Sequence, residues 1–413
     1  MFKNTYFFPF AILLLLSAAC LRNAHTATAH KLTDARDSTA LPPQLTVLPG
    51  ASSVPEYLPL LRGKRIALVT NQTGIIPQAG TGKYIHLADS LLHLGIDIRR
   101  IFSPEHGFRG TAGAGEEVRN GIDSRTGIPI VSLYGVHKKP KPGHLKDIDL
   151  IVFDIQDVGV RFYTYISTLH YVMEAVAQQG IPLIVLDRPN PNARYIDGPV
   201  LKDELRSFVG LHPVPIVYGM TIGEYARMIN GEGWLQGGVS CLLTVIPVTG
   251  YDHRTRYSLP VKPSPNLPND KAIELYPSLC LFEGTAISCG RGTDFPFQIF
   301  GAPDLPSGKY PFAFTPQPDE GAPHPKFAGR RCHGLDLRKE NPTPGLNLQW
   351  ILDAYKDYPD KGAFFNGYFD RLAGDRELKE QIKLGYSQDD IKKTWQPALD
   401  DFKLIRAKYL LYD

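Results

Sequence analysis

Four short apolar runs of the sequence are each followed at once by polar side chains that could do chemistry. The polar segments are Thr70 to Gln72, Ser103 to Gly107, Gln156 to Arg161, and Asp187 to Pro191. If the apolar runs are parallel strands, their carboxyl ends meet at one edge of a sheet, where ligands of open α/β folds bind. The sequence therefore predicts a single site along this edge.

Glu105 is the candidate general acid of this site. It stands between Pro104 and His106, where the backbone is stiff and a carboxyl group could face a crevice and transfer a proton. His106 could orient that carboxyl group. The alternatives are structural: Glu105 as a helix cap or the partner of a surface cation, and His106 as a hydrogen-bonded histidine beside a turn.

Asp154 and Asp157 are further acids at the same edge. Asp154 ends an apolar run, and a buried carboxylate needs a partner, so we expect an ion pair with Arg161 or Arg188. Asp157 lies in the following turn and could be catalytic or an N-cap. The spacing of these groups matches no common set of metal ligands, so we expect no metal site.

Aromatic and basic side chains could bind a sugar or an anion. In Arg161 to Tyr165, one guanidinium is followed by three aromatic rings within five residues, and such rings stack on sugar faces while arginine binds carboxylates. A core aromatic face is the alternative interpretation. Glu283 precedes a second polar segment, in which Arg291 lies between two glycines that allow backbone amides to approach a ligand.

The elements that must position these residues alternate between strands and helices. We expect strands at 65–70, 96–102, 129–133, 150–155 and 182–186, and helices at 84–94 and 165–179. Near-continuous apolar strands separated by helices predict a parallel sheet covered on both faces, a Rossmann-like three-layer α/β domain ending near residue 200. Beyond it we expect a helix from Thr221 with a capping box to Glu224, a strand at 241–247, a helix capped by Ser387, and a final helix around 397–410.

Two classes of function are excluded. The first strand is followed by Asn71-Gln72-Thr73-Gly74 in place of G-x-G-x-x-G, and there is no P-loop lysine motif, so a cofactor-free hydrolase fits better than a nucleotide-dependent enzyme. Across 413 residues, 45 Lys and Arg oppose 42 Asp and Glu without a long basic run, which excludes nucleic acid as a partner.

The N-terminus has the pattern of a secretory signal. Lys3 precedes an apolar stretch and small residues before Cys20, which predicts a lipoprotein-type signal at 1–29 followed by a tether at 30–60. Ala27 to Ala29 offers ordinary cleavage and a soluble periplasmic protein instead. We expect a protein of the periplasm or cell envelope that meets the membrane only through a lipid at Cys20. Cys241, Cys280, Cys289 and Cys332 allow three pairings, among which the sequence does not choose.

The ordered motifs resemble those of the exo-β-N-acetylmuramidases of glycoside hydrolase family 171, formerly grouped as a domain of unknown function. The resemblance covers essentially the whole mature chain. It is carried by Leu68 to Gly74, Ser103 to Gly107, Asp154 to Tyr165, Leu186 to Pro191, Glu283 to Thr285, Gly290 to Thr293, and Tyr409 to Tyr412.

The resemblance implies a Rossmann-like catalytic domain, here 61–205, packed on a smaller second α/β domain, 206–413, with the active site in the cleft between them. It implies hydrolytic release of N-acetylmuramic acid (MurNAc) from the non-reducing end of peptidoglycan fragments, without a cofactor. The catalytic glutamate proposed for the family corresponds to Glu105.

Glycoside hydrolysis normally uses two carboxylates, and Glu283 and then Asp157 are the candidates for the second. The lactyl carboxylate of the substrate requires an arginine, for which Arg161, Arg188 and Arg291 are candidates. The full set of predicted substrate-binding residues is Asn71, Arg161, Tyr163, Tyr165, Asp187, Arg188, Asn190 and Arg291.

Two rival functions belong to other classes. A peptidoglycan-binding lipoprotein could keep the cleft without catalysis. An acyl or amide hydrolase would need an activated nucleophile, and no G-x-S-x-G segment occurs in the chain.

Overall fold

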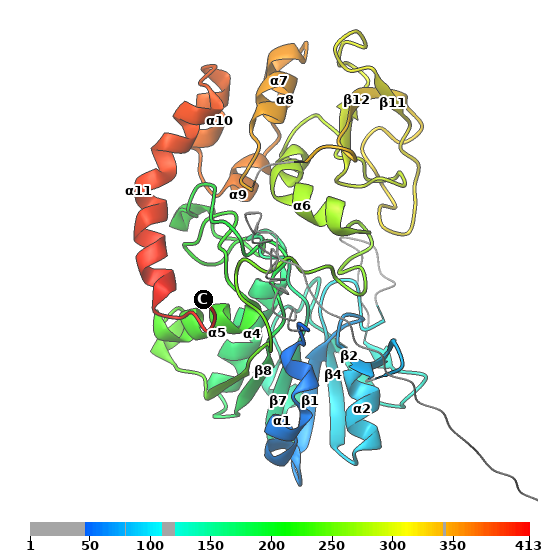
Figure 1. Ribbon diagram of the computed structural model, residues 1–413, viewed down its shortest axis with the longest axis vertical. Coiled ribbons are helices and arrows are strands. Elements are labelled where there is room, and N and C mark those ends of the chain that lie inside the picture. Colours follow the sequence, from blue (N-terminus) through cyan, green and yellow to red (C-terminus); the bar gives the residue numbers. More distant parts are fainter. Residues whose placement is uncertain (1–45, 79, 110–119, 342–343) are drawn as a thin grey trace, which may run out of the picture. The chain divides into compact units, whose positions relative to one another are not determined.

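The computed structural model describes residues 46–413 apart from 79, 110–119 and 342–343 (Figure 1). A seven-stranded sheet forms the centre of the N-terminal part, residues 46–250, which we call the first half of the chain; the residues after 250 are the second half. The strand order is β5-β6-β4-β1-β7-β8-β9, and all neighbours are parallel except β5 and β6. The strands are β1 (Arg65–Thr70), β4 (Asp97–Ser103), β5 (Gly121–Ile122), β6 (Pro129–Ser132), β7 (Leu150–Asp154), β8 (Leu183–Leu186) and β9 (Leu243–Ile246).

Both faces of this sheet are buried, as its near-continuous apolar strands predict. Ile66 and Leu68 of β1 belong to one hydrophobic cluster, whereas Ala67 and Val69 belong to another, because successive side chains of a strand point to opposite faces. The first cluster includes residues of α1 (Val54–Leu61) and α2 (Leu87–His93), and the second includes residues of α4 (Tyr165–Ala177) and α5 (Ile222–Gly231). The predicted three-layer, Rossmann-like α/β arrangement is confirmed.

Part of the segment predicted as a tether is folded. Gly50–Ser52 forms a 3-10 helix, α1 follows, and Ala51 and Tyr57 are fully buried. A side chain at Gly50 would collide with the backbone, since a Cβ there would lie 2.2 Å from the carbonyl oxygen of Ile246. The absence of that side chain lets the start of the described chain lie against the sheet. The predicted signal, Cys20 and the tether up to residue 45 lie outside the described residues.

The second half of the chain contains a three-stranded antiparallel sheet and several helices. The sheet has the order β10-β12-β11, formed by β10 (Ile299–Ala302), β11 (Phe312–Phe314) and β12 (Cys332–Asp336). The helices are α6 (Asp270–Leu279), α7 (Gln349–Asp357), α8 (Lys361–Phe364), α9 (Phe369–Ala373), α10 (Glu377–Lys383) and α11 (Gln388–Ala407). Short α3 (Pro142–Leu145) and 3-10 helices at Asp203–Leu205, Gln236–Gly238 and Cys280–Gly284 complete the helical elements of the described chain. The α/β architecture with a smaller second part is as predicted.

Two predicted helices have different bounds in the structure. The residues at the start of the predicted helix 84–94 instead form β3 (Lys83–His86), which pairs with β2 (Ile75–Gln78), and the helix α2 begins only at Leu87. The side chain of His86 caps that helix by accepting from the amide of Ala88. The two C-terminal helices are one, because α11 continues through Pro397.

The strand predicted at 241–247 joins the first sheet. As β9 it pairs in parallel with β8, although it lies beyond the boundary predicted at residues 205 and 206. Residues 45–413 cluster as one compact unit. The division into domains at that boundary stays a prediction.

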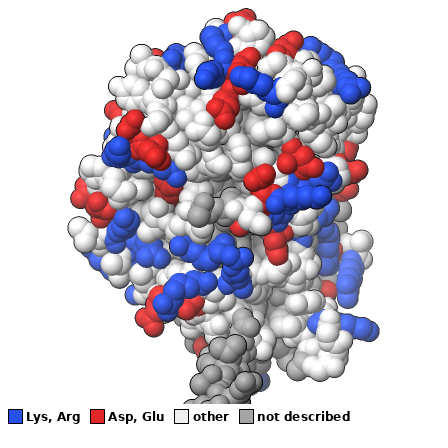
Figure 2. Space-filling model, turned by 45° about the horizontal axis from the view of Figure 1, so that its top comes forward, with Lys and Arg blue, Asp and Glu red and all other residues white. Residues whose placement is uncertain are grey.

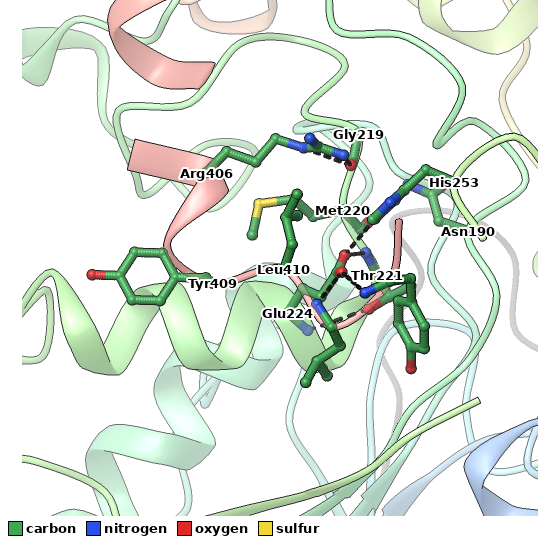
Figure 3. A network of polar contacts seen from close by, with 12 residues as sticks. Asn190, Gly219, Met220, Thr221, Glu224, His253, Arg406, Tyr409 and Leu410 are labelled. Carbon is green, nitrogen blue, oxygen red and sulfur yellow. Dashed lines mark hydrogen bonds and ion pairs between the residues drawn. The ribbon is translucent and has the colours of Figure 1, made fainter. Parts of the chain in front are cut away.

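The C-terminal residues return to α5 and are held there by a buried acid (Figure 3). The carboxylate of Glu224 accepts from the amide of Thr221, which forms the predicted capping box, and contacts Nε2 of His253 at 2.9 Å. Its other oxygen accepts from the amide of Leu411 at 2.8 Å. The end of the chain is therefore part of the packing around α5.

Charged side chains of both signs are interspersed on the face that Figure 2 presents. This distribution agrees with the near balance of 45 basic and 42 acidic residues in the sequence. Among the described residues no helix is long and apolar enough to cross a membrane.

Candidate active site

A cavity of about 1060 Å³ opens beyond the carboxyl ends of β4 and β7, at the predicted edge of the sheet. Residues from both halves of the chain line it. From the first half come Glu105, His106, Tyr134, Lys138, Tyr163, Thr164 and Phe208; from the second come Asn266, Tyr276, Glu283, Cys289, Arg291, Lys326, Tyr368 and Arg371. The cavity thus has the cleft location that the sequence predicts.

Glu105 faces this cavity and is held by the start of α4. Thr164, the residue that precedes α4, donates a hydrogen bond of 2.7 Å to Oε2 of Glu105. Tyr134 also lies against this carboxylate: burial and the charge of Glu105 together raise the pKa of the Tyr134 hydroxyl.

His106 has a strained backbone next to Glu105. Its φ is 72°, in the left-handed region that few residues other than glycine adopt, and its side chain is buried. Gly107 continues the turn with a φ of 79°. This turn directs the side chains of Glu105 and His106 into the same cavity.

Glu283 and Arg291 form an ion pair in the opposite wall. Nε of Arg291 lies 2.5 Å from Oε1 of Glu283, and the thiol of Cys280 lies 3.7 Å from the other carboxylate oxygen. Burial opposes the charge of Arg291, but the neighbouring Glu283 raises the pKa of the guanidinium overall. The guanidinium also lies 5.0 Å from the ring centre of Phe297.

Lys326 fixes the segment that carries Glu283. Its ammonium donates to the carbonyl oxygens of Phe282, Glu283, Thr285 and Ile287 at 2.7 to 3.2 Å. Burial lowers the pKa of this lysine. Four carbonyl dipoles around one ammonium hold the turn between α6 and β10 in a single conformation.

Arg161 was predicted to bind substrate, but it lies outside the cavity. Its side chain is fully buried, and its guanidinium donates to carbonyl oxygens at 2.6 to 3.0 Å. The acceptors are Pro199, Val214, Leu372 and Ala373, so the arginine joins the two halves of the chain. Burial lowers its pKa to about 9. Because both terminal nitrogens are committed to the backbone and the side chain does not line the cavity, we no longer assign it to the lactyl carboxylate.

Arg188 is also committed within the protein. It forms a buried, bidentate ion pair with Asp154, in which its Nε lies 2.6 Å from Oδ1 and a terminal nitrogen lies 3.0 Å from Oδ2. This is one of the two pairings predicted for Asp154. Arg188 is buried and does not line the cavity, so of the three predicted arginines only Arg291 does.

Asp157, predicted as a candidate second acid, does not line the cavity. It is buried outside the cavity and accepts hydrogen bonds from the hydroxyl of Tyr218 and, at 2.7 Å, from the amide of Gly159. Burial raises its pKa from 3.8 to about 6. Within the described chain its Oδ1 has no hydrogen-bond partner. We therefore revise its predicted role to a structural one.

Asp187 and Asn190 hold neighbouring loops together and do not line the cavity. Asp187 accepts from the hydroxyls of Thr221 and Tyr412, both at 2.6 Å, and burial raises its pKa to about 6. Asn190 donates to the carbonyl of Met220 at 2.8 Å. The structure gives both residues internal partners where the sequence predicted contacts with substrate.

Asn71 and Tyr165 lie behind Glu105. Asn71 donates a 2.9 Å hydrogen bond to the hydroxyl of Tyr165, which in turn lies 3.5 Å from the backbone carbonyl of Glu105. Tyr163, by contrast, lines the cavity and packs edge-on against Tyr165 with ring centres 4.8 Å apart. The structure therefore brings together Glu105, His106, Tyr163, Glu283 and Arg291 from the predicted set.

Several cavity residues were not predicted as site residues. Ser264 and Asn266 flank a proline in a short polar segment of the sequence, which is a signal for their position, whereas Tyr276 lies within α6. Phe208, Tyr368 and Arg371 follow no local pattern, since only the packing of loops brings them to the cavity.

The cavity brings together two carboxylates and several aromatic side chains, which are the groups that a glycoside hydrolase uses. Comparison with known proteins identifies the family. The chain belongs to the exo-β-N-acetylmuramidase NamZ family, whose N-terminal model matches residues 66–271 and whose C-terminal model matches residues 274–412. It is therefore a glycosidase, as the resemblance of its motifs implies.

Relatives resemble the chain over nearly its whole length. It is 40% identical over 407 residues to the peptidoglycan β-N-acetylmuramidase NamZ of Bacillus subtilis (strain 168), across 92% of this chain and 94% of that protein. Two crystal structures of DUF1343 family proteins from Bacteroides fragilis are similar. One is 44% identical with a TM-score of 0.81, covering 89% of this chain and 99% of its own. The other is 29% identical with a TM-score of 0.77, covering 90% of this chain and 100% of its own.

Proposed function

We propose that this chain removes MurNAc from the non-reducing end of peptidoglycan fragments, with Glu105 as the general acid that protonates the glycosidic oxygen. The observation that carries this role is the position of Glu105, which faces a cavity large enough for a sugar and is oriented by Thr164. His106, in the same turn, is proposed to keep that carboxyl group in place.

The second carboxylate of the proposed mechanism is Glu283. Hydrolysis of a glycoside needs a base for water or a nucleophile besides the acid. Glu283 lines the same cavity as Glu105, and its ion pair with Arg291 holds its carboxylate in place. The buried Asp157 does not compete for this role.

Arg291 is proposed to bind the lactyl carboxylate of MurNAc. An arginine has five N–H donors, so it can bind a second carboxylate besides Glu283. About a quarter of its side chain is exposed, in keeping with access from the cavity. Tyr163 and Tyr276 supply aromatic faces for the sugar ring.

We also propose that the protein is exported and held by a lipid at Cys20. The support is the charged start, the apolar stretch and the small residues before Cys20 in the sequence. A peptidoglycan substrate requires such a location outside the inner membrane. The test is metabolic labelling with a fatty acid, compared between the natural chain and Cys20→Ala.

The activity is tested with residues 30–413 and the disaccharide MurNAc-β-1,4-GlcNAc, with free MurNAc measured by mass spectrometry. We expect release by the natural chain, loss of release in Glu105→Gln, and unchanged release in the control Glu204→Gln, an exposed acid on a 3-10 helix. Release by Glu105→Gln would keep the enzyme and discard Glu105 as the acid. Binding of muropeptides by the folded protein without release would favour the non-catalytic binder.

A further inference from the structure

A second, basic cavity adjoins the active site. It has a volume of about 350 Å³ and is lined by His137, Lys138, Lys139 and Lys141 together with residues of α3 and of the end of α4 and the turn after it. None of the described residues that line it is Asp or Glu. Lys138 lines both cavities, so the two are neighbours that meet at this residue.

The charge of this basic cavity is only partly compensated. Lys139 is paired with Glu174, at the edge of α4, and also contacts Gln178 at 3.0 Å. The amine of Lys141 lies 3.1 Å from Nε2 of His137, and the amine of Lys138 lies over the ring of Phe208. An anion in the cavity would therefore meet the positive charges of Lys138 and Lys141.

An aromatic surface lies between the two cavities. Phe208 stands in a tight turn closed by reciprocal backbone hydrogen bonds of Ser207 and Gly210, at 2.9 and 3.0 Å. Its half-buried ring lies 4.8 Å from the amine of Lys138 and 6.1 Å from the ring of Tyr134. Tyr134 in turn lies beside Glu105, so this surface begins where the glycosidic oxygen would be protonated.

The aromatic residues next to the basic cavity are accessible. Tyr134 and Phe208 are half-buried, whereas Tyr276, Cys280 and Cys289 elsewhere in the lining are buried. A glycan that leaves the active site toward Lys138 therefore passes over Tyr134 and Phe208.

We propose that the leaving glycan runs over Phe208 and places the lactyl carboxylate of its next MurNAc in the basic cavity, against Lys138 and Lys141. This inference rests on the proposed function and specifies which substrates the same site prefers. Peptide-free peptidoglycan glycan alternates neutral GlcNAc with MurNAc, whose lactyl group is then an anionic carboxylate. The neutral sugar after the cleaved bond thus meets the accessible parts of Tyr134 and Phe208, and the next, anionic sugar meets the lysines.

The proposal implies a preference for chain length that depends on salt. A tetrasaccharide MurNAc-GlcNAc-MurNAc-GlcNAc reaches the basic cavity, whereas the disaccharide MurNAc-GlcNAc does not. An exposed ion pair contributes up to about 1 kcal/mol, which is about a fivefold change in affinity, and salt weakens it.

The test compares the two oligosaccharides in two ways. Binding to Glu105→Gln is measured by calorimetry, which needs no turnover, and kcat/KM is measured with the natural chain. We expect the tetrasaccharide to be preferred through a lower KM, and the preference to fall about threefold to fivefold in Lys138→Gln and in Lys141→Gln and to shrink in high salt.

The control is Lys393→Gln, an exposed lysine on α11 paired with Asp390, which we expect to keep the natural preference. Equal affinity for the two oligosaccharides, or a preference that survives both lysine substitutions or is lost equally in the control, overturns the proposal. A binding preference without hydrolysis by the natural chain would instead contradict the proposed function and leave the basic cavity supported.

Discussion

Thr164 donates a 2.7 Å hydrogen bond to the carboxylate of Glu105 across 59 residues of sequence. Because Thr164 immediately precedes α4, the orientation of the proposed acid depends on where that helix begins. The turn after β4 and the start of α4 thus position the same carboxylate. The sequence of either segment alone does not predict their contact.

Replacing Thr164 by Val should therefore lower kcat with little change in KM. The substitution keeps the shape of the side chain and removes a hydrogen bond to a charged group, which is worth about 1.5 to 3 kcal/mol. If that bond orients Glu105 in the transition state, kcat falls by about tenfold to a hundredfold. Thr164→Ser, which keeps the hydroxyl, should retain most of the activity. Steady-state kinetics on the disaccharide give kcat and KM for both variants. An equal kcat for Thr164→Val and Thr164→Ser would contradict the proposal that the hydroxyl of Thr164 orients Glu105.

Arg161 and Arg291 should respond differently to substitution. Arg161→Met leaves buried carbonyls without a donor and should cost on the order of 3 to 5 kcal/mol in the free energy of unfolding. Arg291→Lys should instead raise KM more than it lowers kcat, because lysine loses the planar fork that binds carboxylates. Urea unfolding and kinetics of both variants check this contrast. An increase in KM for a folded Arg161 variant, with none for Arg291→Lys, would reverse our assignment.

Lys326→Met should reduce kcat/KM although the lysine makes no proposed contact with the reacting atoms. Without the ammonium, four carbonyls of the segment carrying Glu283 lose their common donor. We expect about a tenfold loss of kcat/KM and a lower melting temperature. Lys309→Met, at an exposed ion pair, is the control and should change neither quantity appreciably. An unaltered kcat/KM in Lys326→Met would show that the segment needs no such donor.

The stability contributed by Asp157 should fall as the pH rises. Its pKa in the folded protein, about 6, lies above the ordinary 3.8, so between these values the folded state binds more protons than the unfolded state. The natural chain should therefore lose stability relative to Asp157→Asn from about pH 4 to pH 7, by on the order of 3 kcal/mol. Denaturant unfolding of both chains across this range measures the difference. A difference independent of pH would exclude the raised pKa.

The main sheet was largely predictable because its strands are short, apolar and separated by helical patterns. The strand expected at 65–70 is β1, residue for residue, and the helix expected at 165–179 is α4 with a slightly earlier end. The helix expected from Tyr84 begins later, because β2 and β3 form a hairpin that local helical preference does not reveal. The pairing of β2 with β3 therefore determines the conformation of residues 83–86.

The site was predictable in its location but not in its membership. The rule that ligands bind at the carboxyl ends of parallel strands predicted correctly that Glu105 and His106 line the cavity. It placed Arg161 and Asp157 at the same edge of the sheet, but both are buried outside the cavity. Whether a polar residue faces a cavity or a buried backbone depends on elements from the second half, such as α9, whose last residue Ala373 accepts a hydrogen bond from Arg161. The spacing of residues within the first half carries no information on which elements of the second half bury them.

The contacts of Leu411 and Tyr412 have a consequence for the order of folding. The hydroxyl of Tyr412 and the amide of Leu411 bind the buried acids Asp187 and Glu224, which lie 225 and 187 residues earlier in the sequence. A buried acid without its partner is costly, so packing around α5 is complete only when these distant residues have arrived. Contacts of such large sequence separation form slowly, which makes the environment of α5 a late step of folding.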